Sequence, residues 1–87
     1  MAEDSLLEFP CDFPIKIMGQ ATDEFRSLAL GIVTRHFGTL AADRIEERPS
    51  TGGKYLSLTC TVRAESKAQL DAVYTELTSC SQVLVAL

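Results

Sequence analysis

The feature that most constrains the fold is the eleven-residue run KYLSLTCTVRA, residues 54–64, in which polar and apolar side chains alternate. A strand points successive side chains to opposite faces of a sheet. One face then carries Leu56, Leu58, Cys60, Val62 and Ala64. The other face carries Tyr55, Ser57, Thr59, Thr61 and Arg63. An alternation this long predicts a strand inside a sheet that has one buried face and one wet face.

A shorter alternation, FPIKIMG over residues 13–19, predicts a second strand of the same kind. Its expected buried face carries Phe13, Ile15 and Ile17. Its expected wet face carries Lys16, Met18 and Gln20. Two such strands indicate a sheet that is covered by other elements on one side only.

After each of these strands the apolar period changes to that of a helix. In the first predicted helix the apolar stripe consists of Phe25, Leu28, Ala29, Ile32, Val33 and His36. Thr22 is expected to cap its start and Gly38 to end it. Ser66 and Gln69 form a capping-box pattern that opens a second helix. That helix carries Leu70, Val73, Tyr74 and Leu77 at helical spacing.

Two weaker segments complete the predicted sheet. Residues 41–49, AADRIEERP, contain one large aliphatic side chain, Ile45, and end in Pro49, which predicts a polar edge strand. The C-terminal QVLVAL predicts a short last strand. The order β-α-β-β-α-β predicts an α+β ferredoxin-like sandwich, with a four-stranded antiparallel sheet in the order 4-1-3-2 and both helices on one face. We expect residues 1–10 to form a partly disordered arm and residues 11–87 a single domain.

Charge and cysteine content narrow the range of partners. Twelve acidic and eight basic residues give a net charge of −4, and no run of Lys or Arg occurs. We therefore expect neither nucleic acid nor a membrane as a partner. Cys11, Cys60 and Cys80 include no C-x-x-C pair, so we expect reduced thiols in the cytoplasm, no metal site and no cofactor.

Several short motifs point to a known family. They are LLEFPCDFPIKIMGQA at the start, RHF at the end of the first helix, PSTGGKYLSLT before the third strand, and YTEL. Together they resemble the YbeD-like family of small bacterial proteins of unknown function over nearly the whole chain. The resemblance implies a ferredoxin-like fold similar to ACT domains, which bind small effectors such as amino acids and regulate metabolic enzymes. It brings no catalytic residues with it.

The turn between the first strand and the first helix is one candidate ligand site. Its residues are Gly19, Gln20, Ala21 and Thr22. The amides at the start of a helix and the positive end of its dipole suit a carboxylate or phosphate. ACT-like domains use this region for effectors, usually with a partner subunit that closes the site. The alternative is that Gly19 permits a tight turn and Gln20 bonds locally.

The wet face of the sheet is the second candidate site. We expect it to carry Lys16, Arg44, Arg48, Tyr55, Ser57, Thr59, Thr61 and Arg63. Glu46 is the only acid expected there, so the face should be mildly basic. RNA binding is disfavoured because the central positions hold Ser and Thr where RNA binders of this fold have aromatic residues. The alternative is a solvated face with scattered bases.

We see no nucleophile–base pair and expect no enzymatic activity. His36 is the only histidine and has no Asp or Glu at catalytic spacing, so it is expected to pack or to cap its helix. The leading hypothesis is an ACT-like regulatory or interaction module that senses a small carboxylate or amino-acid effector, or modulates a metabolic enzyme, as a homodimer. The alternative is a protein-binding adaptor without a small ligand, which uses the open sheet face or the N-terminal arm.

Overall fold

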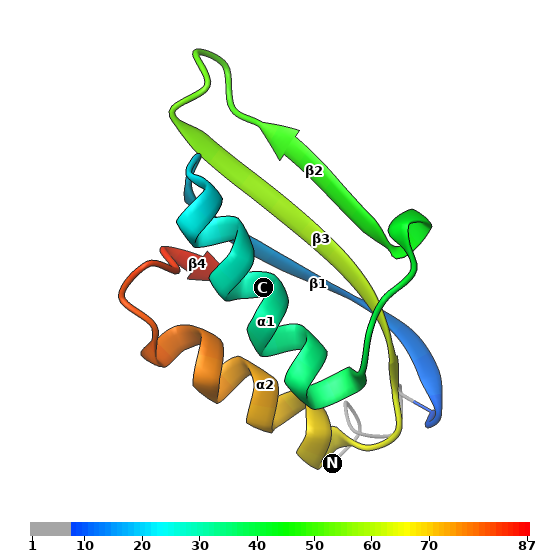
Figure 1. The fold of residues 1–87 in the computed structure, drawn as a ribbon. Helices are drawn as coiled ribbons and strands as arrows, with labels where there is room; N and C mark the ends of the chain where they lie inside the picture. The colour runs from blue at the N-terminus through cyan, green and yellow to red at the C-terminus, as the bar shows by residue number, and fades with distance from the viewer. Residues whose placement is uncertain (1–7) are drawn as a thin grey trace.

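The computed structural model describes residues 8–87, so most of the expected N-terminal arm lies outside the described residues. The elements follow the predicted order (Figure 1). They are β1 (Cys11–Gln20), α1 (Asp23–Phe37), the 3-10 turn η2 (Ala42–Arg44), β2 (Ile45–Pro49), β3 (Tyr55–Ala64), α2 (Lys67–Ser79) and β4 (Val85–Ala86).

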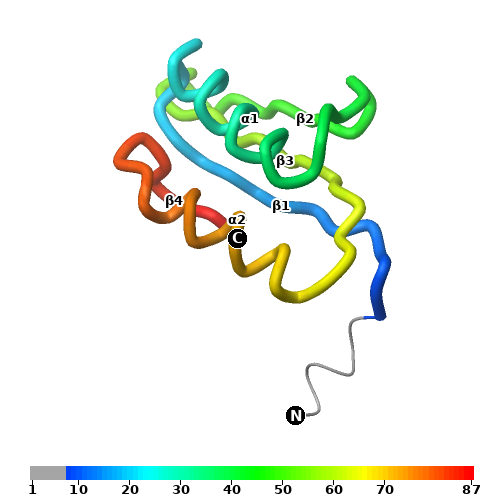
Figure 2. Tube along the Cα trace, turned by 60° about the horizontal axis from the view of Figure 1, so that its bottom comes forward, coloured from blue at the N-terminus to red at the C-terminus, as the bar shows by residue number. Residues whose placement is uncertain are grey.

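The four strands form one antiparallel sheet in the order β2-β3-β1-β4. This is the predicted order read from the opposite edge. β1 and β3 pair along their whole lengths, from Cys11 opposite Ala64 to Gln20 opposite Tyr55. Figure 2 shows β1 running between β3 and β4 through the middle of the molecule. The two strands with the clearest alternation are therefore the central ones, as a sheet with one buried face requires.

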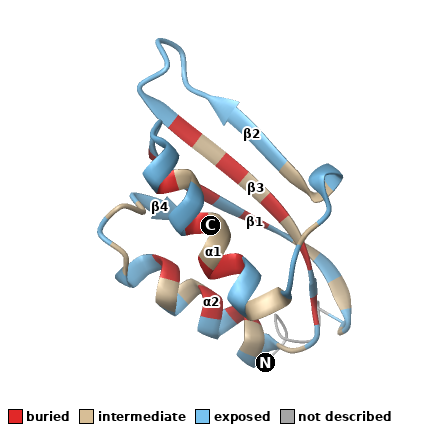
Figure 3. Ribbon diagram, in the orientation of Figure 1, coloured by how far each residue is buried: buried red, intermediate tan, exposed pale blue. Residues whose placement is uncertain are grey.

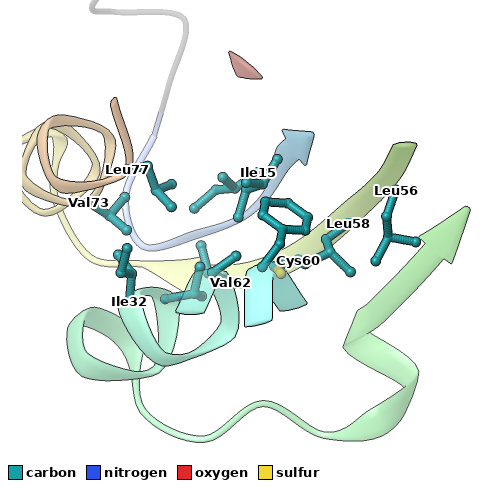
Figure 4. Close-up of a cluster of buried hydrophobic side chains, with 12 residues drawn as sticks. Ile15, Ile32, Leu56, Leu58, Cys60, Val62, Val73 and Leu77 are labelled. Carbon is teal, nitrogen blue, oxygen red and sulfur yellow. The ribbon is translucent and has the colours of Figure 1, made fainter. Parts of the chain in front are cut away.

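Both helices lie over the same face of the sheet (Figure 1). The side chains between the two layers are apolar and most of them are completely buried, and they converge from strands and helices alike (Figure 4). The largest of them are Phe25, Ile15, Ile17, Leu58, Leu77, Val33, Val62 and Val73. Along β3 buried residues alternate with more exposed ones, whereas β2 is exposed over most of its length (Figure 3). The predicted ferredoxin-like sandwich is confirmed.

The predicted caps hold both helices in place. The Thr22 hydroxyl accepts a hydrogen bond from the Phe25 amide at 3.0 Å. At the end of α1, Gly38 has a φ of 84°, a conformation that side chains with a Cβ rarely adopt. The Ser66 hydroxyl accepts from the Gln69 amide at 3.2 Å, and the Gln69 side chain accepts from the Glu65 amide at 2.8 Å. The second bond falls one residue earlier than a standard capping box places it.

Four boundary and face predictions were wrong in detail. β1 begins at Cys11, two residues before the expected start, because its pairing with β3 continues to Ala64. β4 is only two residues long. Residues 42–44 form a 3-10 turn, so the edge strand starts at Ile45. Leu28 is 36% exposed, because it lies about 60° around the helix from Phe25, on the side away from Ala29 and Val33.

Candidate functional site

The turn after β1 is built around contacts within the chain. Gly19 is buried, and a Cβ at this position would lie 2.4 Å from the Phe25 ring and 2.7 Å from the Gln82 carbonyl oxygen. Real side chains do not tolerate such distances, so only glycine fits here without rearrangement. Close packing of the first turn of α1 against the sheet is therefore enough to explain this glycine.

The amides of the same turn have partners within the protein. The Ala21 amide donates to the Lys54 carbonyl at 3.1 Å, and the Thr22 amide donates to the Gln20 carbonyl at 2.8 Å. The first turn of α1 also carries two carboxylates, Asp23 and Glu24, which repel an incoming anion. These contacts favour the reading in which the turn joins a strand to a helix.

One polar cavity adjoins this turn. It has a volume of about 200 Å³ and is lined by Gln20, Ser81, Gln82 and Leu84. Of the four predicted turn residues, only Gln20 lines it. The cavity offers amide and hydroxyl groups and no charged side chain.

The strand register places the predicted wet-face residues together on one surface, which we call the open face. One row across the sheet runs from Arg48 through Ser57 and Met18 to Val85. The next row runs from Glu46 through Thr59 to Lys16, whose backbone exchanges hydrogen bonds of 3.0 and 2.8 Å with Leu87. Farther rows place Thr61 opposite Pro14 and Arg63 opposite Asp12. Tyr55 lies opposite Gln20 at the other end.

The open face is more apolar than the sequence suggested. Met18 is 41% exposed, Tyr55 36%, Val85 42% and Leu87 70%. They are four of the six large apolar side chains exposed among residues 8–87. Val85 and Leu87 were not predicted here, because the alternation of a two-residue strand cannot be recognised in the sequence.

Most charges of the open face are paired with each other. Asp12 Oδ1 lies 3.3 Å from Arg44 Nη1 and 3.6 Å from Arg63 Nη1. Glu46 Oε2 lies 3.1 Å from Arg48 Nη2. The expectation of a single acid on this face was wrong, because the longer β1 brings Asp12 onto it. Arg44 joins the face from η2 through its ion pair rather than from a strand. Within residues 8–87 no carboxylate lies within ion-pair distance of Lys16.

Three adjoining hollows cross the open face, and Ser57 lines all of them. The largest, of about 300 Å³, has apolar walls formed by Met18, Pro49, Tyr55 and Leu56, with Arg48 beside them. The second, of about 150 Å³, is lined by Lys16, Glu46, Arg48, Ser57 and Thr59. The third, of about 40 Å³, includes Met18, Val85 and Leu87. We call the three together the Ser57 trough.

Both outer edges of the sheet carry a proline that lacks the outward-facing amide. Lys16 bonds to Leu87 through its backbone, so alternate residues of β1 face the β4 edge, and Pro14 is one of them. On β2, the Ser50 amide donates to the Tyr55 carbonyl at 2.9 Å, which turns the backbone of Pro49 to the outer edge. A proline at an edge discourages the addition of another strand.

His36 has an acidic partner that the sequence did not predict. Its Nε2 lies 2.8 Å from Glu76 Oε1, and Arg35 also pairs with Glu76. The Gln69 side chain donates to the His36 carbonyl at 3.0 Å. Glu76 is forty residues away in the chain, which no local spacing reveals. The contacts tie α1 to α2 on the side of the molecule away from the open face.

The three cysteines are free thiols. Cys60 is completely buried, and the cost of burying a thiolate raises the pKa of its thiol from 9.0 to about 11.

Among the described residues, no group of three His, Cys, Asp or Glu side chains could hold a metal ion. In the same part of the chain, no helix is long and apolar enough to cross a bilayer.

Known sequences identify the group of proteins to which the chain is related. A model of a family described as a protein of unknown function (DUF493) matches residues 4–87. A UPF0250 protein of Paraburkholderia phytofirmans is 50% identical over 84 residues, which are 97% of this chain and 94% of the relative. A UPF0250 protein of Nitrosomonas europaea is 48% identical over 77 residues, 88% of each chain. The chain therefore belongs to this bacterial family of unknown function, as its resemblance to the YbeD-like proteins predicted.

Proposed function

We propose that this protein is a non-enzymatic, ACT-like interaction module of the cytoplasm that binds a partner protein, such as a metabolic enzyme, through its open face. The observation that carries the proposal is the exposure of Met18, Tyr55, Val85 and Leu87 on one surface beside basic side chains. Exposed apolar side chains gathered on one surface are typical of interaction sites. The free thiols support a reducing compartment.

The partner is proposed to be a different protein rather than a second copy of this chain on the same face. Among residues 8–87, four cations, Lys16, Arg44, Arg48 and Arg63, share the face with two carboxylates, Asp12 and Glu46. Two such faces would bring like net charges together in a face-to-face homodimer. A homodimer through another surface stays compatible with the proposal.

The test compares two exposed apolar residues on opposite sides of the molecule. Met18 is 41% exposed on the open face, and Leu28 is 36% exposed on α1. We expect Met18→Glu to remove specific partners from quantitative co-purification at native expression levels, and Leu28→Glu to leave recovery unchanged. A triple change of Arg44, Arg48 and Arg63 to Glu should also reduce recovery. Equal recovery with all variants would refute the open face as the binding surface.

A second candidate function is supported by the polar cavity beside the turn. Its amide and hydroxyl lining, which includes Gln20, is suited to the polar groups of a small amino-acid or carboxylate effector. We expect such a ligand to raise the melting temperature of the wild type but not of Gln20→Ala. The absence of a shift with amino acids and small carboxylates would leave the open face as the only proposed site.

A further inference from the structure

We propose that the Ser57 trough binds an acidic segment of a partner protein, with an apolar side chain seated between Met18 and Tyr55 and a neighbouring carboxylate on Lys16. This inference rests on the open-face function proposed above and adds the chemistry of the partner. It follows from the shape of the trough, from the pairing of its charges and from the blocked edges of the sheet.

The shape of the trough comes from a small side chain at a central position. Ser57 is flanked by Met18 and Arg48 in its own row and by Tyr55 and Thr59 along β3. All of these except Thr59 are much longer side chains, so the surface is lowest at Ser57, where the three hollows meet. The wall formed by Met18, Pro49 and Tyr55 is apolar, which suits an aliphatic or aromatic anchor residue.

The charges of the trough favour a carboxylate next to that anchor. Arg48 already has Glu46 at 3.1 Å, and Arg44 and Arg63 share Asp12. An incoming carboxylate can therefore pair with Lys16 without breaking any ion pair among residues 8–87. The open face is also net positive in a chain whose net charge is −4, so an acidic segment is attracted to this face more than to the rest of the surface.

The same geometry favours a protein segment over other ligands. The trough is open along the sheet surface, whereas pockets for small molecules usually enclose most of the ligand. Its central positions hold Ser57 and Thr59, and among the residues that line it only Tyr55, at one end, is aromatic, so it offers no row of rings on which successive bases could stack. The prolines at the two edges disfavour binding by strand addition. A segment that lies across the face, with one anchor and one acid, satisfies all three observations.

The test titrates the full-length, isotopically labelled protein with synthetic twelve-residue peptides in which Glu alternates with Leu or Phe. A matched peptide carries Gln in place of every Glu. We expect the acidic peptide to shift the amide signals of Lys16, Met18 and Ser57, with weaker binding as the salt concentration rises. The Gln peptide should bind at least threefold more weakly. Equal binding of the two peptides, or shifts confined to the Gly19 turn or the sheet edges, would overturn the inference.

Two variants and one control locate the interaction. Lys16→Gln should weaken binding of the acidic peptide about twofold to fivefold, which corresponds to the loss of one exposed ion pair. Ser57→Trp should fill the trough and abolish binding while circular dichroism and the melting temperature stay unchanged, because the side chain points away from the core. Arg35→Gln removes a cation on the other side of the molecule and should leave the affinity for the acidic peptide unchanged.

The failure of this inference can be told apart from the failure of the proposed function. If no acidic peptide binds at millimolar concentration but Met18→Glu still removes partners, the acidic chemistry is wrong and the open-face function stands. If Lys16-dependent binding is found for single-stranded oligothymidylate and not for the peptide, the partner class is wrong. If neither peptide binding nor partner recovery depends on the open face, both proposals fail.

Discussion

The two faces of one sheet have opposite properties although they are built from the same strands. On the covered face Ile15, Ile17, Leu58 and Val62 are completely buried beneath α1 and α2. On the open face their immediate neighbours in the chain, Lys16, Ser57 and Thr61, point to solvent beside exposed Met18 and Val85. The fold therefore limits which residue types can stand on the covered face far more strongly than it limits those on the open face.

This difference separates what stabilises the molecule from what it can recognise. A change on the covered face alters close packing and thus the free energy of unfolding. A change on the open face leaves the core intact and alters only surface contacts. The apolar side chains found there do not lie between the two layers, and the proposed binding role rests on this.

The largest expected effect tests the comparison with two neighbouring residues of β3. Leu58→Ala should lower the free energy of unfolding by about 2–5 kcal/mol, because it removes a fully buried side chain and leaves a cavity. Ser57→Ala should change it by less than about 0.5 kcal/mol, as expected for a surface substitution. Urea denaturation of both variants measures the two values. Similar losses for both would mean that the open face is covered in solution.

A second prediction uses pH to measure burial at Cys60. Because burial raises the pKa of this thiol to about 11, the unfolded chain ionises it near pH 9 while the folded chain keeps it protonated. The stabilising contribution is complete below pH 9 and is lost as the pH rises to 11, by about 2–3 kcal/mol in total. Between pH 9 and 11, the free energy of unfolding should fall less steeply for Cys60→Ala than for the wild type, as urea denaturation at each pH measures. The same pH dependence for both proteins would show that the thiol is accessible to solvent.

A third prediction tests how closely α1 approaches the covered face. Gly19→Ala should lower the free energy of unfolding by about 1–3 kcal/mol, because the new methyl group meets the Phe25 ring and the Gln82 carbonyl. Thermal or urea denaturation measures the loss, which should be smaller when Gly19→Ala is made in a Phe25→Leu background than in the wild type. A variant as stable as the wild type would show that the first turn of α1 is packed loosely.

The smallest effect concerns a glycine on the outer side of the same helix. Apart from its chain neighbours and its own helix backbone, no atom of residues 8–87 lies within 4 Å of a Cβ added at Gly31, so Gly31→Ala should meet no obstacle. We expect it to raise the free energy of unfolding by about 0.5–1 kcal/mol, because alanine favours the helix and glycine does not. A rise in the melting temperature measures this. A loss of stability at Gly31 would indicate a contact that the covered layer does not account for.

The sequence predicted the fold well because the fold depends on local periods. The alternation at Leu56 to Ala64 identified β3 and the faces of its residues, and Thr22, Gly38 and Ser66 marked the ends of the helices. Strand order then followed from the polarity of the edge strand and from right-handed crossovers.

The candidate site was predicted only in part because its remaining features depend on contacts between distant segments. Asp12 reaches the open face through pairing that extends β1, and Val85 joins it through a strand of two residues. Ser57 was placed on the correct face, but the trough at this residue depends on longer side chains from two other strands. Glu76 meets His36 only after α1 and α2 have packed.

The most direct test of the two-faced sheet measures solvent access to methyl groups in the purified protein. An uncharged, soluble gadolinium chelate should broaden the methyl signals of Met18, Val85 and Leu87 strongly. Those of Ile15, Ile17 and Leu58 should be nearly unaffected, because they lie between the sheet and the helices. Equal broadening of Met18 and Leu58, or equal protection of both, would contradict the account.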